Sequence, residues 1–289
     1  MSPPPRLGVY LTASPFELAW RDALIASATS AGWQFMDGGP PPAPASDDAA
    51  GILWIADDHT VIDTPSAIDW LVISDSPAAA LASTLSRLGT ATTPSAMAPA
   101  IWHTAQRFAA ASRLASDGAR VLNAAARTLD LPYLGSVHRA EPPVTKPAPG
   151  TVLDVYRTLP PLSGATSTWP PELFTYPSGQ SDDGPVQIDL TGRPRVLVYG
   201  PHIELPAGLW RATLQFVADP EGGHLKLRAE WGSGATITSA RMTIGEAGRY
   251  AIRLDQNWLN QGPAEIRLWL DQASFAGRLS LLDVHVERL

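Results

Sequence analysis

Apolar and polar residues alternate strictly along five segments of this 289-residue chain, all of them after residue 183. A period of two places every second side chain on one face, which is the pattern of an antiparallel strand with one buried side. The apolar members are Trp210, Ala212, Leu214 and Phe216; Leu225, Leu227, Ala229 and Trp231; Tyr250, Ile252 and Leu254; Ile266, Leu268 and Leu270; and Leu282, Val284 and Val286. Seven to nine such strands between Gly/Pro turns predict an all-β, two-sheet sandwich over residues 183–289.

The first part of the chain has a different pattern, in which short apolar runs alternate with helical stripes. Leu7–Leu11, Gly51–Ala56 and Asp69–Ser74 are continuous apolar runs of the kind found in sheets covered on both faces. This order predicts an α/β domain over residues 1–140, with a parallel sheet of about four or five strands in a flavodoxin-like or Rossmann-like layout.

Helix limits in this domain are predicted from capping residues. Ser14-Pro15, with Glu17 three residues after Ser14, is typical of a helix start, and so is Asp75-Ser76-Pro77. A third helical stripe covers Pro94 to Asp130, where we expect Gly118 to break or bend the helix.

A proline-rich bridge over residues 141–182 separates the two domains. Its prolines disfavour helix and central strand, although Val152–Tyr156 could form one short strand. We expect the bridge to pack along the domains, because Trp169, Phe174 and Tyr176 would otherwise be exposed.

Composition excludes several classes of protein. The chain has no cysteine, so disulfides, thiolate metal sites and a cysteine nucleophile are absent. Its net charge of −7 argues against a nucleic-acid partner held by phosphate neutralisation. We expect no membrane span and no secretory signal, and therefore a cytoplasmic location. The alanine and arginine bias, with Lys146 and Lys226 as the only lysines, suggests a GC-rich bacterial genome.

The C-terminal part resembles jelly-roll carbohydrate-binding modules. The resemblance is carried by YGPHIELPAGLWRATLQF (Tyr199–Phe216), GEAGRYAIRL (Gly245–Leu254) and the closing GRLSLLDVHVERL, and it covers residues 185–289. It implies a jelly-roll fold and a saccharide ligand. Similar modules occur beside polysaccharide-assembly domains, which implies a glycan or a glycan-assembly protein as partner.

Two groups of residues in the sandwich are candidate ligand contacts. Trp269 shares the polar face of its strand with Glu265 and Arg267, and an exposed indole beside charged side chains suits a sugar ring. The turn Asp255–Gln261 is rich in amides, among them Asn257, and contains Trp258. The alternatives stay open: Trp269 could cover an interface with the first domain, and Trp258 could cap the sandwich.

The polar faces of the strands also carry an excess of basic residues. If the strands are neighbours, this surface would favour an acidic glycan or a phosphate-bearing ligand; otherwise it is an ordinary solvated face. The residues are Arg211, Lys226, Arg228, Arg253 and Arg267, set against Glu230 and Glu265.

The candidates for catalysis are Asp57, Asp58 and His59, which follow an expected strand of the first domain. They resemble the acidic pair of nucleotide-sugar glycosyltransferases, but the usual Asp-x-Asp spacing is absent. The order strand, Ser-containing loop, helix, Gly-Trp, strand is loosely similar to bacterial TIR-like domains, whose glutamate has no clear match. No GxGxxG, GxxxxGK[ST] or GxSxG motif occurs.

The function predicted from these features is a non-catalytic accessory protein that binds a saccharide or a polysaccharide-assembly partner through its sandwich. Two alternatives remain: a glycosyltransferase-like or nucleotide-using enzyme with its site in the α/β domain, and a protein–protein scaffold. No cofactor and no metal are predicted, and a homo-oligomer is compatible with the sequence.

Overall fold

The computed structural model divides the chain into two units that alternate along the sequence. The first is built mainly from Met1–Thr90 and Gln106–Pro149, and the second mainly from Pro161–Leu289. The described residues are 4–38, 50–57, 68–89, 94–141, 152–177, 186–234 and 236–289. Among them, no helix combines the length and the apolar character that crossing a membrane requires.

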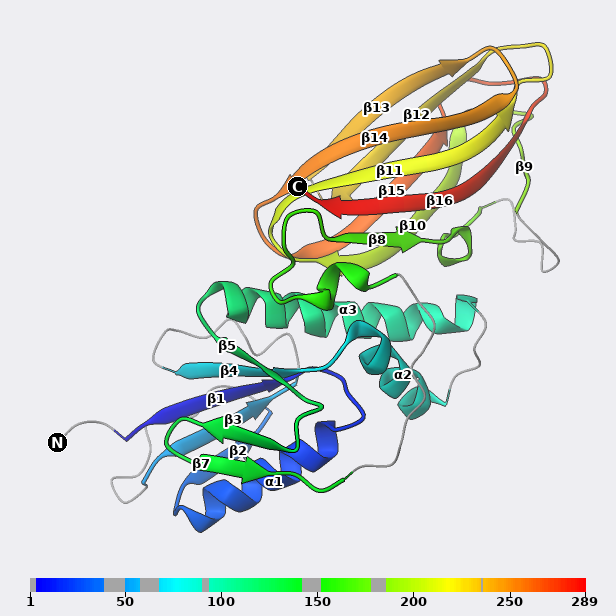
Figure 1. Cartoon of the computed structure of the whole chain (residues 1–289). Helices are drawn as coiled ribbons and strands as arrows, with labels where there is room; N and C mark the ends of the chain where they lie inside the picture. Colours follow the sequence, from blue (N-terminus) through cyan, green and yellow to red (C-terminus); the bar gives the residue numbers. More distant parts are fainter. Residues whose placement is uncertain are drawn as a thin grey trace. The chain divides into compact units, whose positions relative to one another are not determined.

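The first unit contains a five-stranded parallel sheet in the order β2-β3-β1-β4-β5. Its strands are β1 (Arg6–Leu11), β2 (Gln34–Asp37), β3 (Ile52–Ala56), β4 (Asp69–Ser74) and β5 (Arg120–Asn123). The helices are α1 (Glu17–Ser30), α2 (Pro77–Leu88) and α3 (Pro94–Ser116), the last belonging to this unit from Gln106 on. Figure 1 shows α1 on one face of the sheet and α3 on the other.

Both faces of this sheet are buried, which explains the continuous apolar runs. Leu7 and Val9 of β1 pack with Trp20 of α1, whereas Tyr10 packs on the opposite side with Leu114 of α3. The predicted parallel α/β sheet is therefore confirmed. Its strand order is neither the flavodoxin order 2-1-3-4-5 nor the Rossmann order, because β3 lies between β2 and β1.

The predicted helix starts differ in outcome. Helix α2 begins at Pro77, and the Ser76 hydroxyl accepts a hydrogen bond from the Ala79 amide (3.2 Å), so this cap is confirmed. Helix α1 begins at Glu17, not at Pro15. The Ser14 hydroxyl accepts from the Phe16 amide (3.0 Å) ahead of the helix, and Glu17 is buried instead of closing a capping box.

The expected helical segment from Pro94 to Asp130 is only partly helical. Helix α3 ends at Ser116, and Gly118 takes a φ of +102°, a conformation that glycine adopts easily. The chain then turns into β5 at the edge of the sheet, followed by a hairpin of β6 (Thr128–Leu131) and β7 (Gly135–His138). Tertiary pairing outweighs the helical pattern after the glycine.

The second unit is an antiparallel sandwich, as the alternation predicts. One sheet has the order β10-β15-β12-β13 and the other β14-β11-β16-β8, with β9 pairing β16. The strands are β8 (Thr166–Trp169), β9 (Ile188–Asp189), β10 (Arg195–Leu205), β11 (Gly208–Asp219), β12 (Leu225–Ser233), β13 (Thr236–Ile244), β14 (Gly248–Trp258), β15 (Gly262–Leu270) and β16 (Arg278–Arg288). From β10 to β16, every connection except β12–β13 passes from one sheet to the other.

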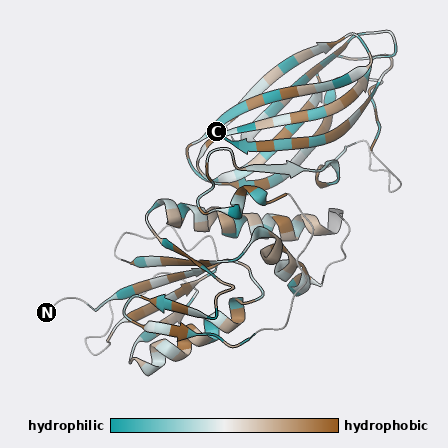
Figure 2. Cartoon of the chain, viewed as in Figure 1, coloured by the Kyte–Doolittle hydropathy of each residue, from teal (hydrophilic) through white to brown (hydrophobic). Residues whose placement is uncertain are grey.

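The core of the sandwich lies between the two sheets and is made of the in-phase residues. Trp210 and Phe216 of β11 in one sheet, and Trp231 of β12 and Ile266 of β15 in the other, are all buried. Figure 2 shows the same alternation as bands of hydrophilic and hydrophobic colour along the strands. Most of β13 is exposed, because it is the edge strand of its sheet.

The expected proline-rich bridge contributes to the sandwich. Strand β8, which contains no proline, pairs with β16 at the edge of one sheet. Trp169, Phe174 and Tyr176 are buried, so the expectation that this segment packs is confirmed. Between residues 152 and 156 the expected strand is wrong: Asp154–Arg157 forms a single 3-10 turn, followed by another, Pro171–Leu173.

Candidate functional site

Two chain reversals at one end of the sandwich enclose a hollow of about 220 Å³, which we call the sandwich-end pocket. One wall is the turn between β12 and β13, with Ser233 and Thr236. The other wall is Gln256–Gly262, the end of β14 and its loop to β15, which is most of the amide-rich turn noted in the sequence. The buried Gln256 side chain joins the sheets by accepting a hydrogen bond from the Thr238 hydroxyl.

The lining of this pocket is polar but uncharged. None of the described residues that line it is Asp, Glu, Lys, Arg or His. Asn257 and Asn260 are exposed, and an amide side chain can both donate and accept hydrogen bonds. Next to these amides, Leu259 is 81% exposed and adds an apolar contact surface.

Two buried polar atoms at the pocket have no hydrogen-bond partner among the described residues. They are the indole Nε1 of Trp258 and the amide Oε1 of Gln261. Unsatisfied buried groups are destabilising by roughly 1–3 kcal/mol each, and proteins keep them mainly where water, an ion or a ligand completes the set. Both atoms belong to residues that line the pocket, but the atoms themselves are shielded from solvent.

The Trp258 ring is not the open stacking surface that the sequence interpretation places there. Only 6% of it is exposed, and it meets the Trp231 ring edge-on with centroids 6.1 Å apart. The reason is phase: Trp258 continues the inward series of Leu254 and Gln256 on β14. Trp258 caps the core at this end of the sandwich, and only its edge borders the pocket.

Trp269, Arg267 and Glu265 lie together on the outer face of β15, as the alternation predicts, but their polar groups bond to one another and to β12. The Trp269 indole donates to Glu230 (2.9 Å), and its ring lies 4.8 Å from the Arg228 guanidinium. Arg267 donates two hydrogen bonds to Glu265, at 2.9 and 2.6 Å. Trp269 is half-buried within this network.

The expected basic surface does not form. Arg211 and Arg253 lie on the sheet that contains β11 and β14, whereas Lys226, Arg228 and Arg267 lie on the other sheet. Three of these arginines are also neutralised by a nearby carboxylate. The pairs are Arg211 with Asp255 (2.8 Å), Arg228 with Asp271 (3.0 Å) and Arg267 with Glu265 (2.6 Å).

In the first unit, Asp57 directly follows β3 and accepts a hydrogen bond from Arg21 (2.7 Å), which also pairs with Asp37. Asp58 and His59 lie outside the described residues, so the structure does not address the expected catalytic group as a whole. Asp57 itself is engaged in an ion pair at the carboxyl ends of β2 and β3.

A second ionic cluster near the carboxyl end of β1 was not foreseen from the sequence. Glu17 is 4% exposed and accepts hydrogen bonds from Arg107 (2.8 Å) and Arg87 (2.9 Å). Arg107 also donates to the Leu11 carbonyl (2.6 Å). Burial alone would lower the pKa of Arg107, but the Glu17 carboxylate outweighs it and raises that pKa. Nothing in the spacing of these residues predicts the pairing, since 90 positions separate Glu17 from Arg107.

Comparisons with known proteins give no family. No family profile and no curated protein matches the chain. Among solved structures, a family 61 carbohydrate-binding module in complex with β-1,4-galactotriose is 17% identical, covers 43% of this chain and 83% of its own, and has a TM-score of 0.29.

Two further solved structures are similar to the same extent. A family 36 module of a xylanase from the hindgut metagenome of Trinervitermes trinervoides is 11% identical, with a TM-score of 0.29, and covers 43% of this chain and 98% of its own. A module of Cellvibrio mixtus lichenase 5A in complex with cellotriose is 14% identical, with a TM-score of 0.25, and covers 43% and 97%. Likenesses this low assign neither ligand nor activity.

Proposed function

We propose that this protein is a non-catalytic accessory protein that binds a neutral saccharide in the sandwich-end pocket. The observation that carries the proposal is the pocket's lining: exposed amides and an exposed leucine, with no charged side chain among the described lining residues. Each sugar hydroxyl both donates and accepts a hydrogen bond, so a saccharide can bond to the exposed side-chain amides of Asn257 and Asn260, which also do both. The jelly-roll resemblance of the sequence agrees with this ligand class.

The sandwich-end pocket is a better candidate than the outer face of β15. On that face Trp269, Arg267 and Glu265 already bond with their neighbours, so a ligand would have to break existing hydrogen bonds. At the pocket, Asn257 and Asn260 project from exposed positions. We also propose that its partner is a glycan-assembly protein and that it acts in the cytoplasm.

The test is a titration of the full chain with cellotriose, followed by isothermal calorimetry and by saturation-transfer NMR. Losing one hydrogen bond to the ligand costs about 0.5–1.5 kcal/mol of binding free energy, so Asn257→Ala should weaken binding by about two- to twelvefold. Combining it with Asn260→Ala should weaken binding further.

Trp269→Ala and Glu265→Gln are the matched controls, because they alter the other candidate surface. They should leave the affinity unchanged. If these two variants lose the ligand while the asparagine variants retain it, the site is the outer face of β15 and the proposed pocket is wrong.

A further inference from the structure

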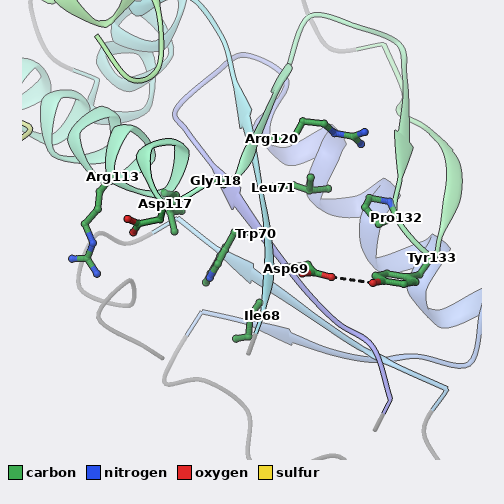
Figure 3. A pocket seen from close by; sticks show the side chains of 12 residues that line it. Ile68, Asp69, Trp70, Leu71, Arg113, Asp117, Gly118, Arg120, Pro132 and Tyr133 are labelled. Carbon is green, nitrogen blue, oxygen red and sulfur yellow. Dashed lines mark hydrogen bonds between the residues drawn. The ribbon is translucent and has the colours of Figure 1, made fainter. Parts of the chain in front are cut away.

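A second hollow, of about 710 Å³, lies in the first unit at the amino ends of β4 and β5, and we call it the amino-edge pocket (Figure 3). The pairing between these strands begins only at Leu71 and Arg120, so the start of β4 has no β5 neighbour. Its volume falls within the range of about 300–1,000 Å³ that is typical of small-molecule sites. All of its lining residues belong to one unit.

The structure fixes Trp70 rigidly in this pocket. Its indole lies over Gly8 of the neighbouring strand, where a Cβ would come within 2.6 Å of the ring. On the same side of the sheet, its centroid is 5.1 Å from that of Trp54. A glycine inside a strand weakens that strand, and it often marks a position where another group approaches the backbone closely. Here the missing side chain leaves room for the half-buried Trp70 indole, which packs on the α3 side of the sheet and forms one wall of the pocket.

Tyr133 forms another wall, in a strained conformation. The Leu134 amide donates to the Pro132 carbonyl (2.7 Å), closing a γ-turn around Tyr133, whose φ is +65°. Gamma-turns with a positive central φ are rare and strained, and such strain collects at ligand sites. The tyrosine is 59% exposed: its ring contacts that of the buried Trp33 (centroids 6.1 Å apart), and the rest of its surface is open. Its hydroxyl donates to Asp69 (2.9 Å), which aims the ring across the strand end (Figure 3).

The charged groups of the pocket balance. Asp69 and Asp117 supply carboxylates, and Arg113 and Arg120 supply guanidinium groups, for a formal sum of zero. Asp69 uses one oxygen for Tyr133, and Arg120 uses one N–H for the Asp130 carbonyl (2.6 Å). The lining thus offers both donors and acceptors, but its charges cancel. It therefore has no excess of positive charge to attract a phosphorylated ligand.

We propose that the amino-edge pocket binds a neutral ring compound with vicinal hydroxyls, independently of the sandwich. The C–H face of such a ring suits the exposed ring of Tyr133. On the same side of β4, two adjacent hydroxyls can donate to the Asp69 carboxylate and accept from Arg120 (Figure 3). A free pyranose and the ribose of a nucleoside share this chemistry, so the experiment includes both.

The test measures binding of cellobiose and of adenosine to the full chain by NMR titration, followed at the signals of residues that line the amino-edge pocket and not the sandwich-end pocket, with thermal melting alongside. Tyr133→Gly loses the contacts of the ring with Asp69 and Trp33, but it suits the positive φ, which offsets that loss, so it should melt near the wild-type temperature. It should nevertheless weaken binding at least tenfold. Tyr133→Phe keeps the ring and loses the bond to Asp69, and it should weaken binding about threefold, which covers the case that the glycine variant misfolds.

Phe35→Ala is the matched control, because Phe35 is 45% exposed on an edge strand of the same unit and does not line the pocket. At the amino-edge pocket, this variant should bind as the wild type does. A response to cellobiose alone identifies a saccharide site, and one to adenosine alone a nucleoside site. If neither probe binds, or if both tyrosine variants bind like the wild type, the proposal is overturned.

Discussion

Truncating the tryptophans of the sandwich separates core from surface. Trp231 is fully buried and Trp258 is 6% exposed, and the two rings meet edge-on at 6.1 Å. Trp→Ala in a core is destabilising by about 3–5 kcal/mol, and an aromatic pair contributes about 0.5–1.5 kcal/mol beyond its area. We therefore expect Trp231→Ala and Trp258→Ala each to lower the free energy of unfolding by about 3–5 kcal/mol.

Trp269→Ala is the contrasting variant. It removes a hydrogen bond to Glu230 and a cation–π contact with Arg228, but Arg228 still neutralises that carboxylate. We expect a loss of only about 1–2 kcal/mol. Urea unfolding should be combined with hydrogen exchange of peptides from β12 and β14, because two units need not unfold together. Equal losses for Trp258→Ala and Trp269→Ala would refute the reasoning.

Three further predictions concern stability. Burial raises the pKa of Glu204 from its ordinary value near 4.5 to about 7, so between these pH values the folded state holds a proton that the unfolded state releases. The free energy of unfolding should therefore fall by on the order of 3 kcal/mol as pH rises from about 4.5 to 7. Glu204→Gln should abolish this pH dependence, as urea titrations at pH 5 and 8 would measure. Gly232→Ala should lower the free energy of unfolding by several kcal/mol in the same urea assay, because the new Cβ would meet the backbone of Thr236 and lie 2.8 Å from the Ile237 Cα. A free energy of unfolding like that of the wild type would contradict this. Glu17→Gln should be destabilising by about 3–5 kcal/mol because it leaves Arg107 buried without its carboxylate, and a change below 1 kcal/mol would show that the cluster is not structural.

The strands of the sandwich were predictable because each has one buried face, so period two survives in the sequence. The same rule carries Trp258 inward, since it lies in phase with Ile252 and Leu254 on β14. The sequence interpretation assigned Trp258 to a turn, because Gln256 interrupts the apolar series with an amide. That amide is buried and bonded to the opposite sheet, which only the packing of two sheets reveals.

Pairings between distant segments could not be predicted. The contact of Ser233 and Thr236 with the Asn257 loop depends on which hairpins share an end of the sandwich. In the first unit, the segment after Gly118 joins the sheet edge because β4 offers a free neighbour, although its own pattern is helical. Local pattern determines element type where burial is one-sided, but partner choice is set by the whole fold.

The response to salt distinguishes the sandwich-end pocket from the charged face of the same sandwich. None of the described residues lining the pocket is charged, and the nearby Asp255 is paired with Arg211 (2.8 Å). The outer face of β15, in contrast, carries Arg267 and Glu265. Screening shortens the range of charge interactions from about 10 Å at 0.1 M salt to about 3 Å at 1 M.

Binding of cellotriose at the sandwich-end pocket should therefore change by less than about twofold over this range of salt, because amide–hydroxyl hydrogen bonds carry no net charge. An acidic oligosaccharide bound through Arg267 would respond to salt, since its negative charge would interact with a guanidinium that is 35% exposed. Calorimetric titrations with cellotriose at the two salt concentrations test the prediction. A tenfold loss of cellotriose affinity in 1 M salt would show that charges contribute to binding, and the amide pocket would then have to be abandoned as the saccharide site.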